Sequence, residues 1–405
     1  MGFLAKPKRH MQLQNATTTP MSLSELVDSL SPTTSAGEIV TPERSKSVAT
    51  AYRAGNIISD DVGKIPFQQF IRQGREIQQV QPDARTMNLA YLLEVSPNQW
   101  GWTPFQFKKA IIQWQIYHGN ALVWRPPVWP PQLLILPANR SKPVFDVGGT
   151  LWYEHKFSNQ KVEYIPSVEV LHLLINPDDT GFWGRGVITF ARETLGKQLG
   201  SYRTQANLIG KGLKSYAYVQ VPGVLDKPGR SKIRDAYEEA LEAYGLAVFD
   251  NKITKFEPIQ MKLTDAQFLE QIQATDLDIA NFFGVSLAML NMGKEAYNSN
   301  EQKYIEYLQG TLDAYLVPFE QAARIRWLSA EEQGRSYFKF IRDALLRMDA
   351  RGRAETNEAR IRSGVMTPNE AREKDDMSAY PEGDKYYMTS NYAPIEPIGG
   401  DDEEE

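Results

Sequence analysis

Few residues in this sequence could carry out covalent or acid–base chemistry. There is no cysteine, which excludes disulfides, thiolate metal ligands and a cysteine nucleophile. The four histidines are His10, His118, His155 and His172. His155 and His172 fall in predicted strands and could pair across a sheet, but a catalytic zinc usually needs three protein ligands. We interpret His118, which precedes Gly119, as a residue at the negative end of a helix dipole.

The acidic residues also give no convincing catalytic site. Asp178 and Asp179 could bind a divalent ion, but in a loop of turn-forming residues an Asp-Asp pair more often forms a turn. Asp276 and Asp278 would face different sides of one helix, about 200° apart. A two-metal site needs carboxylates that converge from several elements. We therefore predict no catalytic residue and no metal ligand.

Nucleotide-binding loops are absent as well. The segment Gly181–Gly186 contains three glycines, but their spacing matches no phosphate-binding motif and no Lys-Ser or Lys-Thr pair follows them. Neither HExxH nor GxSxG occurs. The sequence therefore predicts a protein that is not an enzyme and needs no cofactor.

Composition places the chain among ordinary globular proteins. Its 405 residues are enough for two or three domains, with 42% hydrophobic and 23% charged residues. The 45 basic and 50 acidic residues give a net charge of −5. This balance argues against a surface coated with basic charge for tight duplex binding, but it is compatible with DNA that slides past. No apolar run reaches about 18 residues, so we expect no membrane span. The basic start lacks the apolar stretch of a secretory signal.

The periodicity of apolar residues predicts an α+β fold. Residues 1–44 are predicted to form a flexible arm, with at most a short helix at 22–30. A region with a mostly antiparallel sheet follows, and then longer helices. Helices are predicted over 42–65, 103–118, 186–211, 228–244, 265–283, 299–328 with an interruption at Pro318, 343–362 and 368–372. Strands are predicted over 67–72, 76–80, 121–124, 132–136, 143–145, 151–157, 162–165, 168–174, 215–221, 247–249, 254–258 and 333–341.

Six short motifs occur in an order that resembles the portal family of long-tailed phages. Each motif alone is weak, but six in order at plausible spacing are specific. Two departures are Ser286, where the family usually has proline, and Val187-Ile188 in place of Ser-Pro. The resemblance covers about 45–392. Its motifs are Thr103-Pro-Phe-Gln-Phe107, His118-Gly-Asn-Ala121, Gly181–Gly186, Gln267–Glu270 with Asp278–Ser286, Asn298–Gln302 and Met366–Arg372.

The resemblance implies a portal fold with an α/β wing, long stem helices, a small α/β clip and a helical crown. We assign the wing to 45–185 with 299–330 returning to it, and the stem to 186–212 and 262–284. The clip would be 213–261, the channel loop 287–300 and the crown 340–392. Residues 393–405 would form an acidic disordered tail.

The resemblance also implies a function and partners. Portal subunits form a ring, usually of twelve, at one capsid vertex, and double-stranded DNA passes through the ring during packaging and ejection. The expected partners are the large terminase subunit, the major capsid protein and the head–tail connector, without a membrane. The expected location is the virion, and the host cytoplasm during assembly.

Three groups of residues become candidates for these contacts. On the first stem helix they are the cations Arg192, Lys197, Arg203, Lys211 and Lys214, facing DNA or a neighbouring subunit. In the channel loop they are Asn291, Lys294, Glu295, Tyr297 and Asn298. In the clip, Asp226, Lys227 and Arg230 are candidates for partner binding.

Two other classes of function remain open at this level. One is a metal-dependent nuclease or other packaging enzyme that would use Asp178, Asp179 and the histidines. The other is a capsid or adaptor protein.

Overall fold

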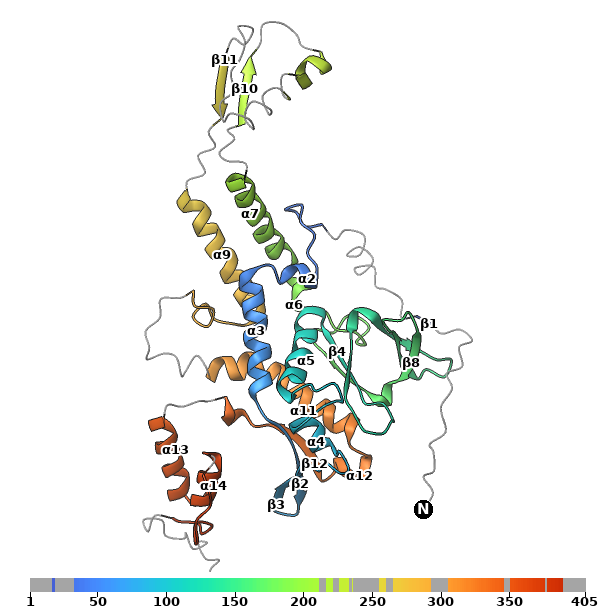
Figure 1. Ribbon diagram of the computed structural model, residues 1–405, viewed down its shortest axis with the longest axis vertical. Helices are drawn as coiled ribbons and strands as arrows, with labels where there is room; N and C mark the ends of the chain where they lie inside the picture. The colour runs from blue at the N-terminus through green and yellow to red at the C-terminus, as the bar shows by residue number, and fades with distance from the viewer. Residues whose placement is uncertain are drawn as a thin grey trace, which may run out of the picture. The chain divides into compact units, whose positions relative to one another are not determined.

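The structure is a computed structural model that describes residues 17–18, 33–210, 216–220, 226–232, 235, 255–259, 265–292, 305–345, 350–375 and 377–388. The chain forms two compact units, Met1–Phe340 and Ile341–Glu405. The predicted α+β class is confirmed, since helices and antiparallel sheets both contribute to the first unit (Figure 1). None of the described helices is long and apolar enough to span a membrane.

Two packed helices, α3 (Ala49–Lys64) and α5 (Pro104–His118), form the centre of the first unit. Their close contact depends on glycine. A Cβ at Gly63 would lie 2.8 Å from the Phe105 ring, and one at Gly55 would overlap the Tyr117 hydroxyl. The predicted start of α5 is confirmed, because Thr103 and Gln106 form a capping box.

The helix predicted over 42–65 is instead two helices, α2 (Pro42–Ser45) and α3. The break lies at residues 46–48, where Val48 adopts an extended conformation and is fully buried. The hydroxyls of Ser45 and Ser47 donate to the carbonyls of Pro42 and Arg44, and such local hydrogen bonds compete with the helix.

One sheet joins segments from both ends of the first unit. Its strands are β12 (Ser336–Phe340), β2 (Phe67–Gln73) and β3 (Glu76–Gln79), in that order and antiparallel. Helix α4 (Leu89–Glu94), which the sequence did not predict, packs on β2. Helix α11 (Asp313–Trp327) packs on β12 and supplies Phe319. The ring of Phe67 lies 4.3 Å from Phe340 and 4.9 Å from Phe319, so aromatic packing binds the two chain segments together.

The sheet predicted within 121–174 is two antiparallel sheets that share a core. One contains β5 (Leu134–Leu136), β4 (Asn120–Trp124) and β9 (Val170–Leu174). The other contains β1 (Thr17–Thr18), β6 (Ser141–Phe145), β7 (Leu151–Lys156) and β8 (Val162–Pro166). Leu122 and Leu136 of the first sheet pack with Tyr153 and Ile165 of the second. The two faces therefore bury one another.

This division overturns one prediction. His155 and His172 do not pair across a sheet, because His155 lies in β7 and His172 lies in β9. The short turn η2 (Ser167–Glu169) separates β8 from β9 and directs β9 to the other sheet.

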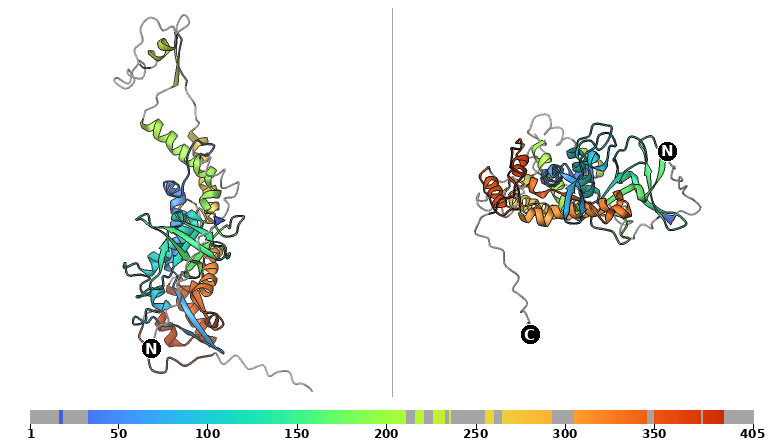
Figure 2. Two further views of the ribbon diagram at one scale, coloured as in Figure 1. Left: turned by 90° about the vertical axis from the view of Figure 1, so that its right-hand side faces the viewer. Right: turned by 90° about the horizontal axis from the view of Figure 1, so that it is seen from below.

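The long helices of the first unit pack in a pair. Helix α6 (Val187–Phe190) leads into α7 (Arg192–Gly210), which packs against α9 (Asp265–Phe283) (Figures 1 and 2). The single helix predicted over 186–211 is therefore divided at Ala191. Between the two helices in the sequence, β10 (Tyr216–Gln220) pairs with β11 (Lys255–Ile259). Of the helix predicted over 228–244, residues 228–232 and 235 are helical, and the rest lies outside the described residues, as does the strand predicted at 247–249.

Pro318 does not interrupt its helix, which corrects another prediction. It lies on the exposed side of α11, and the helix continues to Trp327. The irregular part is a π-helical segment, η4 (Leu308–Leu312), directly before α11.

The second unit contains η5 (Arg342–Ala344), α13 (Ala350–Arg362) and α14 (Pro368–Lys374). The predicted capping box of Thr367 and Glu370 is confirmed. Asn369 is buried and donates to the Tyr380 carbonyl and to Asp384, while its own oxygen accepts from the Tyr380 backbone N–H. This amide therefore fixes the segment after α14 onto the helix.

The prediction of a flexible arm over 1–44 is wrong for residues 33–44. These residues form a hydrogen-bonded turn and α2, and Glu38 within them is only 2% exposed. Thr17 and Thr18 also pair with β6. The other residues of the predicted arm, and the acidic tail, lie outside the described residues.

The aromatic cluster gives a test of this fold. We expect Phe67→Ala to lower the free energy of unfolding by about 3–5 kcal/mol, because it removes a ring that is 1% exposed and contacts three other aromatic rings. All the tryptophans lie between Trp100 and Trp327, so denaturation followed by tryptophan fluorescence reports on the first unit. Phe190→Ala, which truncates a half-exposed ring, is the control and should change little. Equal effects of the two variants would contradict the packing.

Candidate functional site

The side chain of Asn120 ties the end of α5 to the loop before the long helices. Its Oδ1 accepts from the Gly184 backbone N–H at 2.7 Å, and its Nδ2 donates to the Gly184 carbonyl at 2.8 Å. Nδ2 also donates to the His118 carbonyl, and Oδ1 accepts from His172 Nε2 at 3.0 Å. Both donors and both acceptor positions of this fully buried amide are therefore used. We call this cluster of Asn120, Gly184 and His172 the Asn120 joint.

Glycines allow the two backbones at the joint to approach. Gly119 ends α5 with a φ of +79°, and a Cβ there would lie 2.5 Å from the backbone of Gly184. A Cβ at Gly186 would lie 2.5 Å from the Tyr117 carbonyl oxygen. Any larger residue at these positions would push the loop away from α5. Two of the three glycines of Gly181–Gly186, Gly184 and Gly186, thus serve a backbone crossing.

The joint determines where the paired helices begin. The Ile175 N–H donates to the Gly119 carbonyl, and the Arg185 N–H donates to the Ile175 carbonyl. The loop therefore leaves β9 and returns to the end of α5 before α6 starts at Val187. Because only one residue separates α6 from α7, a displacement of the loop at the joint would also displace the long helices.

The acidic pair in this loop forms a turn. The Asp178 carboxylate accepts from the backbone N–H of Thr180 at 3.1 Å and from its hydroxyl at 2.6 Å. The Asp178 N–H donates to the Trp183 carbonyl. Among the residues that the structure describes, no group of three or more acidic or histidine side chains could hold a metal ion. The interpretation of Asp178 as a turn residue is therefore confirmed.

His172 is held in its neutral form. Asn120 Oδ1, which accepts from the Gly184 N–H, is an amide oxygen and cannot donate, so His172 Nε2 must donate to it. The His172 Nδ1 then accepts from the Tyr153 hydroxyl at 3.0 Å. Burial lowers the pKa of His172 to about 4, and the charge of Arg326 acts in the same direction. The ring therefore works as a fixed hydrogen-bonding spacer between the two sheets.

The other described histidines also have structural surroundings. His155 Nδ1 shares a hydrogen bond with the Ser141 hydroxyl at 2.8 Å. His118 ends α5 as predicted and packs on Trp114, with Glu43 at 3.8 Å from its Nε2. Burial lowers the pKa of both rings. His10 lies outside the described residues.

Three of the five cations predicted to face DNA are described. Arg192, Lys197 and Arg203 lie on α7, with Lys197 and Arg203 exposed. Arg203 forms an ion pair with Glu38 at 2.9 Å. Hydrogen bonds from Ser35 are the main cause that lowers the pKa of Glu193. The charges of Lys197 and Arg192 lower it further. Lys211 and Lys214 lie outside the described residues.

The other two groups of candidates are only partly described. Asn291 is exposed and has a φ of +61°, whereas Lys294, Glu295, Tyr297 and Asn298 lie outside the described residues. Asp226, Lys227 and Arg230 are exposed. The Asp226 carboxylate accepts from the Gly229 N–H at 2.9 Å, so it caps a helical turn.

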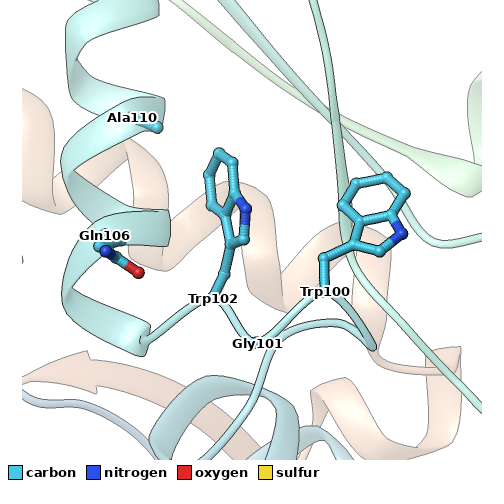
Figure 3. A pocket seen from close by; sticks show the side chains of 5 residues that line it. All are labelled: Trp100, Gly101, Trp102, Gln106 and Ala110. Carbon is cyan, nitrogen blue, oxygen red and sulfur yellow. The ribbon is translucent and has the colours of Figure 1, made fainter.

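A shallow hollow beside the start of α5 was not predicted. It has a volume of about 480 Å³ and is lined by Trp100, Gly101, Trp102, Gln106 and Ala110. Figure 3 shows the two indole rings on the same side of their loop, with Trp102 the nearer to α5. No acidic or basic side chain lines it, so it does not resemble an active site. The two tryptophans on either side of Gly101 were the local sequence signal for it.

The sequence matches the family model described as phage portal protein over residues 49–376. The chain belongs to this family. It is 25% identical over 370 residues to the portal protein of Enterobacteria phage HK97, covering 89% of this chain and 86% of that protein. It is 28% identical over 242 residues to a probable portal protein of Streptomyces phage phiC31, covering 56% and 51%.

Two solved structures share the fold. A portal protein of the HK97 family from Corynebacterium diphtheriae has a TM-score of 0.56 at 15% identity, covering 76% of this chain and 97% of that chain. A chain in the virion of a gene transfer agent has a TM-score of 0.55 at 14% identity, covering 91% and 96%. The predicted portal fold is thus confirmed.

The joint explains why two of the portal motifs occur together. His118–Ala121 supplies the end of α5 and the Asn120 amide, and Gly181–Gly186 supplies the backbone that this amide clamps. The sequence departs from the family motif at Val187-Ile188, directly after the segment that Asn120 holds. Both residues are buried at the start of α6. The departure therefore leaves the joint of this portal protein intact.

Loss of the Asn120 amide gives the second test. We expect Asn120→Ala to lower the free energy of unfolding by about 2–4 kcal/mol, because it leaves the buried N–H and C=O of Gly184 without their partner. Asn281→Ala, on the exposed side of α9, is the matched control and should change stability little. The measurement is denaturation followed by tryptophan fluorescence. A loss no greater than that of the control would show that the joint does not hold the loop.

His172 predicts how stability depends on pH. Its folded pKa of about 4 lies below the ordinary 6.5, so the unfolded chain binds more protons between these values. The stability from the neutral ring is present above pH 6.5 and is lost as the pH falls to about 4, by about 2–3 kcal/mol. We expect His172→Gln to lose this part of the pH dependence, measured as the difference from the wild-type unfolding curve. An unchanged pH profile in the variant would contradict this assignment.

Proposed function

We propose that this portal protein assembles into a ring at one vertex of a phage capsid and that double-stranded DNA passes through the ring during packaging and ejection. The observation that carries the proposal is the match to the portal family over residues 49–376. It is supported by the joint, which uses two motifs of the family to set the start of the long helices. A channel protein needs such a rigid connection, because DNA is moved past it under load.

The ring is proposed to contain twelve subunits. Support comes from a related fold in the neck of a gene transfer agent, whose structure was computed with C12 symmetry; it has a TM-score of 0.51 and covers 88% of this chain and 99% of that chain. Each subunit in a closed cyclic ring presents two different faces to its neighbours. The half-exposed apolar residues of the first unit are compatible with such contacts.

The parts of the chain are proposed to correspond to the parts of a portal. The wing is 45–185 with 299–330, the stem is 186–212 with 262–284, and the clip is 213–261. The pairing of α7 with α9, and of β10 with β11 between them in sequence, supports the stem and the clip. The channel loop at 287–300 and the crown at 340–392 follow from their order in the chain.

DNA is proposed to pass along the stem. The candidate cations are Arg192, Lys197, Arg203, Lys211 and Lys214, and Asn291–Asn298 would reach toward the duplex from the channel loop. Helix α9 contains the acidic residues Asp265, Glu270, Asp276 and Asp278, which balance the basic residues of α7. A mixed surface suits a channel, since every phosphate neutralised by a cation adds affinity that would slow the sliding of DNA.

The outer contacts are proposed to lie at the clip and the wing. Asp226, Lys227 and Arg230 are exposed and would contact the large terminase subunit first and the head–tail connector later. The wing would contact the major capsid protein. These partners place the protein in the virion, and in the host cytoplasm during assembly.

The role is structural and not enzymatic in this proposal. The nuclease alternative needs Asp178 and the histidines at one metal site, but Asp178 is bonded within its own turn and His155 and His172 lie on different sheets. The capsid or adaptor alternative predicts shells or small oligomers in place of rings.

Electron microscopy of the purified full-length protein tests the proposal. We expect closed rings with a central hole and a particle mass about twelve times that of one chain, with light scattering as the independent measurement. Rings of a different subunit number would revise the count only. A stable monomer, or a closed shell, would overturn the proposed function.

A further inference from the structure

Residues 33–40 form a compact turn that we call the strap. The Thr34 hydroxyl donates to the Glu38 carbonyl at 2.9 Å, and the Gly37 N–H donates to the Thr34 carbonyl at 2.8 Å. A backbone bridge between Thr33 and Ile39 closes the turn. The strap therefore has a conformation of its own and is not an extended linker.

The strap packs along the first half of α7. Two glycines one turn apart, Gly196 and Gly200, present a flat face to Thr34 and Ala36, and a Cβ at Gly196 would overlap Thr34. The Ser35 N–H donates to the Glu193 carboxylate at 3.1 Å, and the Ser35 hydroxyl donates to the same group. The strap is thus held at both its backbone and its side chains.

One buried carboxylate of the strap joins two arginines. Glu38 is 2% exposed, and its two oxygens pair separately with Arg44 of α2 and with Arg203 of α7. The Arg203 side chain is 58% exposed, so its outer side still faces solvent. Arg44 also donates to the Ile39 carbonyl. Glu38 therefore neutralises Arg203 from the buried side, while the outer side of the guanidinium stays open to solvent.

We propose that the strap weakens the attraction of Arg203 for DNA, because the Glu38 carboxylate partly neutralises the guanidinium from its buried side. The contact between Arg203 and Glu38 is an ion pair, and a guanidinium that already faces one negative charge attracts a phosphate less strongly. In a ring, each neutralised arginine weakens one phosphate contact per subunit, and the effect is repeated around the channel. The inference rests on the proposed passage of DNA along the stem and adds a device that weakens its grip.

The test compares DNA affinities of the full-length protein at several salt concentrations. The probe is a short fluorescent DNA duplex, and the readout is fluorescence anisotropy. We expect Glu38→Gln to bind the duplex about threefold or more tightly at about 50 mM salt and to steepen the salt dependence by about one ion per engaged arginine. Ser35→Ala, which only loosens the strap, should act in the same direction with a smaller effect.

Two further variants identify the cause. Glu43→Gln makes the same charge change at an exposed position of α2, so it controls for net charge. The double variant E38Q/R203A should lose the gain in affinity. Equal gains for Glu43→Gln and Glu38→Gln, a gain that persists in the double variant, or no gain in any strap variant would each overturn the inference. Ring formation, seen by microscopy, decides the proposed portal function separately from these outcomes.

Discussion

The arrangement of the first unit depends on one amide. Asn120 satisfies both polar groups of Gly184 and also holds His172, and it does so without contact with solvent. A buried backbone N–H or C=O that lacks a partner costs about 1–3 kcal/mol, so the loop has one strongly preferred position. Because the long helices start directly after this loop, their origin is defined by hydrogen bonds and not by apolar packing alone.

Charged residues of α7 are also paired with groups of the same chain. Glu193 accepts hydrogen bonds from the strap, and Arg203 is paired with the buried Glu38. Exposed charges on this helix are therefore partly neutralised from within the same chain. We propose that this pairing lowers the affinity of the helix for DNA without removing its basic residues.

The titratable groups that are buried serve the fold. His172 is kept neutral between two sheets, and the buried ammonium of Lys108 donates to the Ile65 carbonyl at the end of α3. Burial lowers the pKa of Lys108 to about 8. Perturbed pKa values often mark active sites, but His172 is bonded to structural side chains and Lys108 to a backbone carbonyl. Such groups specify position in this protein.

The sequence by itself determined the features whose interactions are local. The capping boxes at Thr103 and Thr367 and the glycine after His118 act within about one helical turn, so they are readable from neighbouring residues. The order of short motifs was enough to indicate the family, because it reflects the order of the elements. Only the tertiary structure decided that β9 joins a different sheet from β7, that Asn120 clamps Gly184, and that Glu38 binds Arg203. These contacts join residues far apart in the chain, and no local pattern specifies which distant polar group will satisfy a buried one.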